Sequence, residues 1–373
     1  MKLKIVVTFG TRPEAIKMMP VYTELKKYPE YFDVSLIVTG QHREMLDQIL
    51  EIYGVVPDVD FNIMKSEQTL TEITNALEIK YGEYFEKEKP DLVLVHGDTT
   101  TALVAAFEAF YNKIKIGHVE AGLRTHNRLN PFPEEINRQL IARFASFHFA
   151  PTTQAAENLK KENVQGRIFV TGNTAIDALF INLEQQYDDE LLQKVEDDKM
   201  IVLTTHRREN LGEAMRNIFL AMKEISKTWP EYSVVYPVHM NPQIRKLATE
   251  MLSKEKNIFL IPPVGVVGFH HYLNKAKIIL TDSGGIQEEA PSLGKPVLVL
   301  RETTERPEGV ENGNLRIVGT DKDRIINEVQ KLLNDSSYYK SFTDIANPYG
   351  DGTAAKRIVD VIKKNLNYFT IHN

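Results

Sequence analysis

The stretch Lys277–Ala290, KIILTDSGGIQEEA, is the most informative part of this chain about its fold. The apolar run Ile278–Leu280 predicts a buried strand, Asp282–Gly285 predicts a tight turn, and a helix is expected from Ile286 onward. A strand that opens through glycines into a helix leaves backbone N–H groups and a positive dipole end at one place. The turn therefore predicts a phosphate or diphosphate site, although an ordinary strand–turn–helix unit would show the same pattern.

Two carboxylates, Glu288 and Glu289, follow within the first turns of this helix. A carboxylate at this position can stabilise the helix through its dipole, or it can accept hydrogen bonds from ribose hydroxyls. Taken with the glycine turn, the second interpretation favours a nucleotide site.

The composition is that of a globular protein with 42% hydrophobic and 26% charged residues, and its 373 residues favour two domains. The net charge of −6 does not suggest nucleic-acid binding. The chain contains no cysteine, which excludes disulfides, thiolate catalysis and thiolate-bound metals. No apolar run approaches the roughly 18 residues of a membrane span, and the start is too short in apolar residues for a signal peptide. We therefore expect a cytoplasmic protein that does not bind a membrane.

Short apolar strands alternate with amphipathic helices along the whole chain, which predicts two doubly wound parallel α/β domains of the Rossmann-like type. A boundary is expected near Thr171–Thr174. The strands expected before it are Ile5–Phe9, Val34–Thr39, Leu92–His96, Ile116–Val119, Phe147–Ala150 and Ile168–Thr171, and those after it are Ile201–Thr205, Val234–Val238, Ile258–Ile261, Ile278–Thr281, Pro296–Leu300 and Leu315–Val318.

Charged residues follow several of the strands in the first half. Because ligands bind beyond the carboxyl ends of parallel strands, we expect these residues in one cleft between the two domains. Arg12 and Lys17 would bring positive charge to it, unless they are solvated charges at a helix start. Asp98 and Glu120 end neighbouring strands, which suggests acid–base work, although Asp98 could also cap a helix.

A third carboxylate of the first half, Glu134, is expected in the first turn of a helix that begins at Pro133. Its alternative role is a local ion pair with Arg138, four residues further on.

The strand ends of the second half carry mainly cationic groups. His206, Arg207 and Arg208 follow one strand, His239 follows the next, and Arg306 lies beyond a third. They could neutralise a diphosphate leaving group, and His206 could donate or accept a proton. No metal-binding spacing is convincing, and neither a Walker loop nor a Gly-x-Gly-x-x-Gly turn is present.

Nine segments together resemble the non-hydrolysing bacterial UDP-N-acetylglucosamine 2-epimerases, in the order of that family. They are GTRPEAIKMMP (10–20), VHGDTTT (95–101), GHVEAGLRT (117–125), PFPEEINRQ (131–139), HRREN (206–210), YPVHMNP (236–242), TDSGGIQEEAPSLGKPV (281–297), TTERPEGV (303–310) and NPYGDG (347–352). The resemblance spans the chain from Phe9 to about Gly352.

The resemblance implies the glycosyltransferase-B fold in a homodimer, with an N-terminal domain at 1–171, a UDP-binding domain at 172–353, and a last helix at about 354–373 crossing back to the first domain. It implies reversible conversion of UDP-N-acetylglucosamine to UDP-N-acetylmannosamine, by elimination of UDP to a 2-acetamidoglucal and readdition. No cofactor or metal is expected. The product would supply N-acetylmannosamine units for a cell-surface polysaccharide.

The resemblance also implies roles for individual residues. The expected catalytic set is Asp98, Glu120, Glu134 and His206. The expected UDP-binding set is Arg12, Lys17, Arg207, Phe269, Ser283, Gly284, Gly285, Glu289 and Arg306, with Phe269 beside the uracil and Glu289 on the ribose. Some relatives bind a second UDP-N-acetylglucosamine as an allosteric activator, and Gln41, Gln68, Arg208 and His239 match that site, to which Glu134 also contributes.

The chain departs from the family pattern at a few positions. Gly265 and Gly268 stand where relatives often have aspartates, which raises the question of how the loop before Phe269 is shaped. Glu44 and Glu67 stand where certain relatives have glutamine and arginine, which should weaken an anionic activator. The alternative functions are a UDP-sugar glycosyltransferase of the same fold, a hydrolysing 2-epimerase and a nucleotide-sugar sensor.

Overall fold

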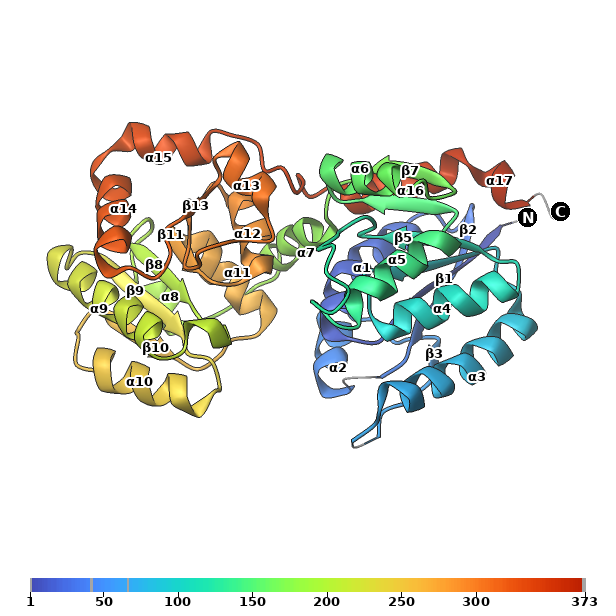
Figure 1. Cartoon of the computed structure of the whole chain (residues 1–373), viewed down its shortest axis with the longest axis horizontal. Coiled ribbons are helices and arrows are strands. Elements are labelled where there is room, and N and C mark those ends of the chain that lie inside the picture. The colour runs from blue at the N-terminus through green and yellow to red at the C-terminus, as the bar shows by residue number, and fades with distance from the viewer. Residues whose placement is uncertain (1, 41–42, 66, 371–373) are drawn as a thin grey trace. The chain divides into compact units, whose positions relative to one another are not determined.

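The computed structural model describes residues 2–40, 43–65 and 67–370, and the chain divides into two compact units. Unit 1 comprises Met1–Ala178 and Gly352–Asn373, and unit 2 comprises Leu179–Asp351. Each unit is built on a parallel β-sheet with its helices around it (Figure 1). This confirms the predicted fold class of two doubly wound α/β units.

Unit 1 has a seven-stranded sheet in the order β3-β2-β1-β4-β5-β6-β7. Its strands are β1 (Leu3–Phe9), β2 (Phe32–Val38), β3 (Val59–Asp60), β4 (Leu92–His96), β5 (Lys115–Val119), β6 (Phe147–Ala150) and β7 (Arg167–Val170). Its helices are α1 (Arg12–Lys26), α2 (Arg43–Ile52), α3 (Leu70–Glu88), α4 (Thr100–Tyr111), α5 (Glu134–Phe144), α6 (Thr153–Lys161), α16 (Ala354–Lys364) and α17 (Leu366–Thr370), and α7 (Thr174–Leu183) begins here and ends in unit 2.

Unit 2 has a six-stranded sheet in the order β10-β9-β8-β11-β12-β13. Its strands are β8 (Met200–Thr204), β9 (Ser233–Pro237), β10 (Ile258–Ile261), β11 (Ala276–Thr281), β12 (Val297–Val299) and β13 (Leu315–Ile317). Its helices are α8 (Glu190–Lys194), α9 (Glu213–Thr228), α10 (Pro242–Leu252), α11 (Val266–Lys275), α12 (Gly284–Glu289), α13 (Pro307–Asn312), α14 (Lys322–Asn334) and α15 (Ser336–Thr343), with 3₁₀ turns η1 (Arg208–Asn210) and η2 (Ala290–Leu293).

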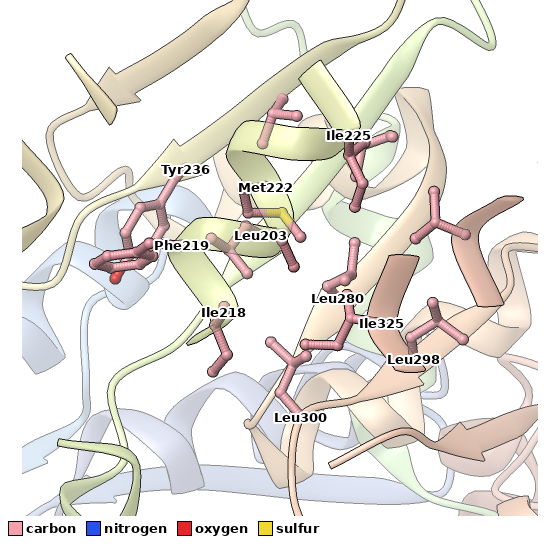
Figure 2. Close-up of a cluster of buried hydrophobic side chains, with 14 of the residues drawn as sticks. Leu203, Ile218, Phe219, Met222, Ile225, Tyr236, Leu280, Leu298, Leu300 and Ile325 are labelled. Atoms are coloured by element: carbon pink, nitrogen blue, oxygen red, sulfur yellow. The ribbon is translucent and has the colours of Figure 1, made fainter. Parts of the chain in front are cut away.

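The strands of unit 2 are mostly apolar because both faces of the sheet are buried. On one face Leu203 and Leu280 pack under Phe219 and Met222 of α9, as Figure 2 shows. On the other face the intervening strand residues, such as Ile279, pack in a second cluster with α11. Every strand predicted from the sequence is present in the two sheets.

The C-terminal segment completes unit 1. The backbone N–H groups of Ala354 and Ala355, at the start of α16, donate to the buried carboxylate of Asp177 at 3.1 and 2.9 Å. Ile358 and Ile362 are buried, and α16 packs on α1. Within the described ranges, no helix combines the length and apolar character needed to cross a membrane.

Candidate active site

The predicted site residues of each unit gather at the point where the sheet changes its direction of winding. This point lies between β1 and β4 in unit 1 and between β8 and β11 in unit 2. The loops that follow two such strands diverge and leave room for a ligand. In both units a buried carboxylate ties the two loops together.

In unit 1 this carboxylate is Glu14, which is 2% exposed. Its Oε2 accepts from the backbone N–H groups of Gly10 and Thr11 at 3.1 and 2.9 Å, and its Oε1 accepts from the Thr99 hydroxyl at 2.6 Å. Burial raises the pKa of Glu14. The sequence analysis gave Glu14 no role, although the Thr11–Glu14 spacing of a capping box signals it.

Asp98 lies in the second of these loops and forms an ion pair with the guanidinium of Arg138 on α5. Burial raises the pKa of Asp98 against the effect of Arg138, and the charges of Glu120 and Glu134 raise it further. The structure therefore brings these three predicted carboxylates close enough to act on one another. The alternative role of Asp98 as a helix cap is wrong, because Thr99 caps α4 by accepting from Ala102 N at 3.0 Å.

The ion pair considered between Glu134 and Arg138 is not formed. Arg138 instead contacts Glu135 at 3.5 Å in addition to Asp98. Glu135 is fully buried and accepts from the backbone N–H of Thr125 at 3.0 Å. The helix begins at Glu134, one residue after the position predicted from Pro133.

Glu120 directly follows β5 in the left-handed region, with φ of 62°, and its carboxylate contacts side chains of α1 and β4. Lys17 of α1 forms an ion pair with its Oε2. The Nε2 atom of His96 lies 3.6 Å from the same oxygen. Burial lowers the pKa of His96 to about 4, so this imidazole is neutral. The sequence analysis gave no role to His96.

Arg12 is the first residue of α1, and its buried Nε atom makes no hydrogen bond to any residue that the structure describes. The side chain of Gln68 makes hydrogen bonds to the neighbouring backbone: it accepts from Lys65 N at 2.8 Å and donates to Ile63 O at 3.0 Å. Gln41 of the predicted activator site lies outside the described residues.

In unit 2 the carboxylate that ties the loops is Asp282, which follows β11 and is fully buried. Its Oδ2 accepts four hydrogen bonds from the loop after β8, at 2.9 to 3.0 Å. The donors are Thr205 Oγ1, His206 N, Arg207 N and Asn210 Nδ2. The sequence analysis placed Asp282 in the glycine turn without this role. An aspartate that precedes two glycines at a strand end is the signal that could have indicated it.

The His206 ring lies beside this carboxylate, with its Nδ1 3.2 Å from Asp282 Oδ1, but no hydrogen bond joins the two atoms. Burial lowers the pKa of His206. Asp282 raises this pKa in part, whereas the nearby His239 and Arg207 lower it further. The rings of His206 and His239 stack with centroids 5.5 Å apart. Both line a pocket of about 190 Å³ that Phe269 also lines.

Two arginines from other loops of unit 2, Arg207 and Arg306, lie beside the glycine turn. Helix α12 begins at Gly284, two residues before the predicted start, and a Cβ atom there would lie 3.5 Å from the Arg306 guanidinium. Arg306 is held by Glu288, with Nε to Oε1 at 2.6 Å, and Arg207 Nε donates to Asp282 O at 3.1 Å. The predicted residues Ser283, Gly284, Arg207 and Arg306 thus surround one turn.

Glu289 follows Glu288, the partner of Arg306, in the chain. Its side chain faces α11, where its Oε2 atom lies 3.4 Å from His270 Nε2. The two glycines that depart from the family pattern lie at the start of α11, Gly265 at its N-cap and Gly268 within it. Gly265 precedes α11 in an extended conformation with open space around it, whereas a Cβ atom at Gly268 would lie 2.4 Å from the Tyr187 ring. Tyr187 therefore occupies the space that a side chain at 268 would need.

Histidine, aspartate and glutamate side chains gather in several places, but none of the described residues forms a cluster of three or more arranged to hold a metal ion. Two doubly wound parallel units, one with acidic side chains beyond its strands and one with arginines beside a glycine turn, define a protein of the glycosyltransferase-B-like fold class.

A family model described as UDP-N-acetylglucosamine 2-epimerase matches residues 23–363. The UDP-N-acetylglucosamine 2-epimerase of Bacillus subtilis is 54% identical over 98% of this chain and 97% of its own. The crystal structure of a putative UDP-N-acetylglucosamine 2-epimerase from Listeria monocytogenes has a TM-score of 0.94 and 48% identity, covering 99% of this chain and 98% of that one.

The UDP-GlcNAc 2-epimerase of Neisseria meningitidis, solved bound to UDP-GlcNAc, has a TM-score of 0.84 and 47% identity over 97% of this chain and 100% of its own. This chain belongs to the UDP-N-acetylglucosamine 2-epimerase family, which confirms the resemblance seen in the sequence.

Proposed function

We propose that the chain catalyses reversible epimerisation of UDP-N-acetylglucosamine at C2, by eliminating UDP to a 2-acetamidoglucal and adding it back with the opposite configuration. The observation that carries this proposal is the electrostatic cluster of Asp98 with Glu120 and Glu134. The binding of UDP-GlcNAc by the Neisseria relative, which is 47% identical, supports the substrate.

The reaction needs a base and an acid, because the weakly acidic C2 proton leaves on one side and returns on the other. The surroundings of Asp98 and Glu120 suit these two roles. Burial raises the pKa of Asp98 and favours its protonated form, and Lys17 forms an ion pair with the carboxylate of Glu120. Two carboxylates in different environments are a common acid–base arrangement.

We assign the UDP moiety to unit 2. Arg207, Arg306 and the turn Ser283–Gly285 would hold the diphosphate, and Arg12 and Lys17 are proposed as further UDP-binding cations. Phe269 would lie beside the uracil, and Glu289 would accept from the ribose. His206, beside the buried Asp282, would stabilise or protonate the departing phosphate oxygen.

The test is incubation with UDP-N-acetylglucosamine alone in D₂O, followed by NMR. The expected result is the manno isomer with deuterium at C2 and no net loss of UDP-sugar. Free N-acetylmannosamine and UDP would indicate a hydrolysing enzyme instead. Unchanged, unlabelled substrate would refute the proposal and leave a transferase that needs an acceptor, or a sensor.

We further propose that the protein acts in the cytoplasm and supplies N-acetylmannosamine units for a cell-surface polysaccharide. Deleting the gene should remove that sugar from surface glycans and leave its nucleotide precursor in the soluble fraction. A surface glycan with unchanged composition in the deletion strain would contradict this role.

A homodimer through α4 and α5 is supported by an apolar face on these helices. Phe110, Tyr111 and Leu140 are 52%, 64% and 42% exposed in the single chain, and Phe110 packs on Phe144. Analytical ultracentrifugation should give a dimer that Phe110→Glu with Tyr111→Glu converts to monomer. A monomeric wild-type protein would refute this interface.

The activator site is proposed on Gln41, Gln68, Arg208 and His239. Arg208 is exposed and His239 lines the pocket of Phe269, so both can reach a ligand. The exposed Glu67 would weaken an anionic activator. Substrate activation predicts sigmoidal rates that Arg208→Ala makes hyperbolic. Hyperbolic wild-type kinetics without a lag, and no stimulation of the reverse reaction by added UDP-N-acetylglucosamine, would reject it.

A further inference from the structure

Glu120 is contacted from two sides by groups of different charge. Lys17 of α1 forms an ion pair with Oε2, and His96 at the end of β4 places Nε2 3.6 Å from the same oxygen. That separation is just beyond hydrogen-bond length, so the cation holds the carboxylate while the imidazole stands next to it.

His96 is buried, with 4% of its surface exposed, and its Nε2 makes no hydrogen bond within the described part of the chain. Leaving a buried imidazole nitrogen without a partner costs free energy, and the proposed roles of the other residues do not use it. A movement of under about 1 Å would bring Nε2–H to a normal hydrogen-bond distance from Glu120.

Lys17 is also one of the cations that we assign to the substrate's diphosphate. An ammonium group that faces two anions divides its attraction between them, so a bound diphosphate would weaken the ion pair of Lys17 with Glu120. Resting on the proposed epimerase function, we infer that His96 is a positioning residue that takes over Glu120 by an Nε2–H hydrogen bond when Lys17 turns to the substrate.

The exchange gives a specific dependence on pH. A hydrogen bond to the ionised carboxylate lowers the pKa of Glu120, so losing it moves the acid limb of activity to higher pH. Among the residues that the structure describes, the charged groups that act on Glu120 include Lys17 of α1 and Asp98 of the loop after β4, and Asp98 in turn faces Arg138 and Glu134 of α5. None of these groups is changed by substituting His96.

The free enzyme and the complex should therefore respond differently. The acid limb of kcat/KM reports the free enzyme, where Lys17 holds Glu120, and the acid limb of kcat reports the complex. In His96→Leu the acid limb of kcat should rise by about one pH unit, as expected for one hydrogen bond to a charged group. The limb of kcat/KM should stay near its wild-type position.

The experiment measures both profiles from pH 5 to 9, by the rate of UDP-N-acetylmannosamine formation, for wild type, His96→Leu and His96→Gln. The glutamine amide places an N–H near the position of Nε2 and should restore the kcat limb. His148→Leu is the matched control, because it removes another buried imidazole whose Nε2 pairs with Gln165 O at 2.8 Å, away from Glu120.

A purely structural role for His96 would shift neither limb or both limbs together, and either result overturns the inference. If His96→Leu fails to fold, His96→Asn replaces it, since its shorter amide cannot reach Glu120. A wild-type protein that leaves C2 unlabelled in D₂O overturns the proposed function, and this inference with it. An active wild type whose variants keep its kcat limb overturns this inference alone.

Discussion

Replacing Asp282 with asparagine tests whether one buried charge organises the loop that carries His206. The carboxylate accepts four hydrogen bonds on Oδ2 and is fully buried, so solvent does not screen it. Hydrogen bonds to a charged group contribute about 1.5–3 kcal/mol each, against about 0.5–1.5 for neutral pairs. Because bonds that share one oxygen are not additive, the expected loss in unfolding free energy is about 2–4 kcal/mol.

The assay is urea unfolding followed by the fluorescence of Trp229, which is the single tryptophan of the chain. It packs against the core cluster of unit 2, so it reports the unit that contains Asp282. Thr205→Val is the matched control, because it removes one of the four donors and leaves the charge in place. Its expected cost is about 1 kcal/mol.

The comparison of the two variants decides the outcome. If Asp282→Asn loses no more stability than Thr205→Val, the charge does not anchor the loop and the reasoning is refuted. If it loses about 2–4 kcal/mol while turnover also falls, the orientation of His206 depends on the same anchor.

Three further predictions concern other parts of the molecule. Asp98→Asn should keep UDP binding by calorimetry and lose about 10²-fold or more in turnover; wild-type turnover would remove Asp98 from the catalytic set. Gly10→Ala would place a Cβ atom 2.3 Å from the Thr39 hydroxyl and should lower the free energy of unfolding by about 1–3 kcal/mol. Gly265→Ala, where the added Cβ atom meets open space, should change it by less than about 0.5 kcal/mol in the same chemical unfolding assay. Burial opposes ionisation of Glu305, but its ion pair with Arg301 lowers the pKa of Glu305 to about 2. The pair therefore stabilises the fold fully above about pH 4.5, and this stabilisation is lost as the pH falls toward 2. Between these pH values the melting temperature of Glu305→Gln should fall less than that of the wild type.

The strands could be predicted from the sequence because buried parallel strands leave continuous apolar runs, such as Ile278–Leu280. The strand Val59–Asp60 was missed because two residues carry no periodic signal. Glycines at strand ends predict a ligand site there because ligands bind beyond the carboxyl ends of parallel strands, and this site stays a prediction.

The partners of the site residues could not be predicted in the same way. Arg138 is four residues from Glu134, but it pairs with Asp98, forty positions away in the chain. His96 and Lys17 meet Glu120 only because β4, β5 and α1 are brought together by the fold. The sequence pattern predicts which charged residues lie at strand ends, but the pairs that they form depend on the tertiary packing of segments far apart in the chain.

The capping of α16 by Asp177 has a consequence for the order in which the chain folds. Unit 2 is inserted between Ala178 and Gly352, so the helix that closes unit 1 leaves the ribosome only after unit 2. Until then the apolar surface of α1 that receives Ile358 and Ile362 stays uncovered, and Asp177 lacks its two amide donors. The ribosome must therefore synthesise unit 2 before unit 1 can be complete, and the packing around α1, which carries Arg12 and Lys17, is finished by a helix from beyond the insertion.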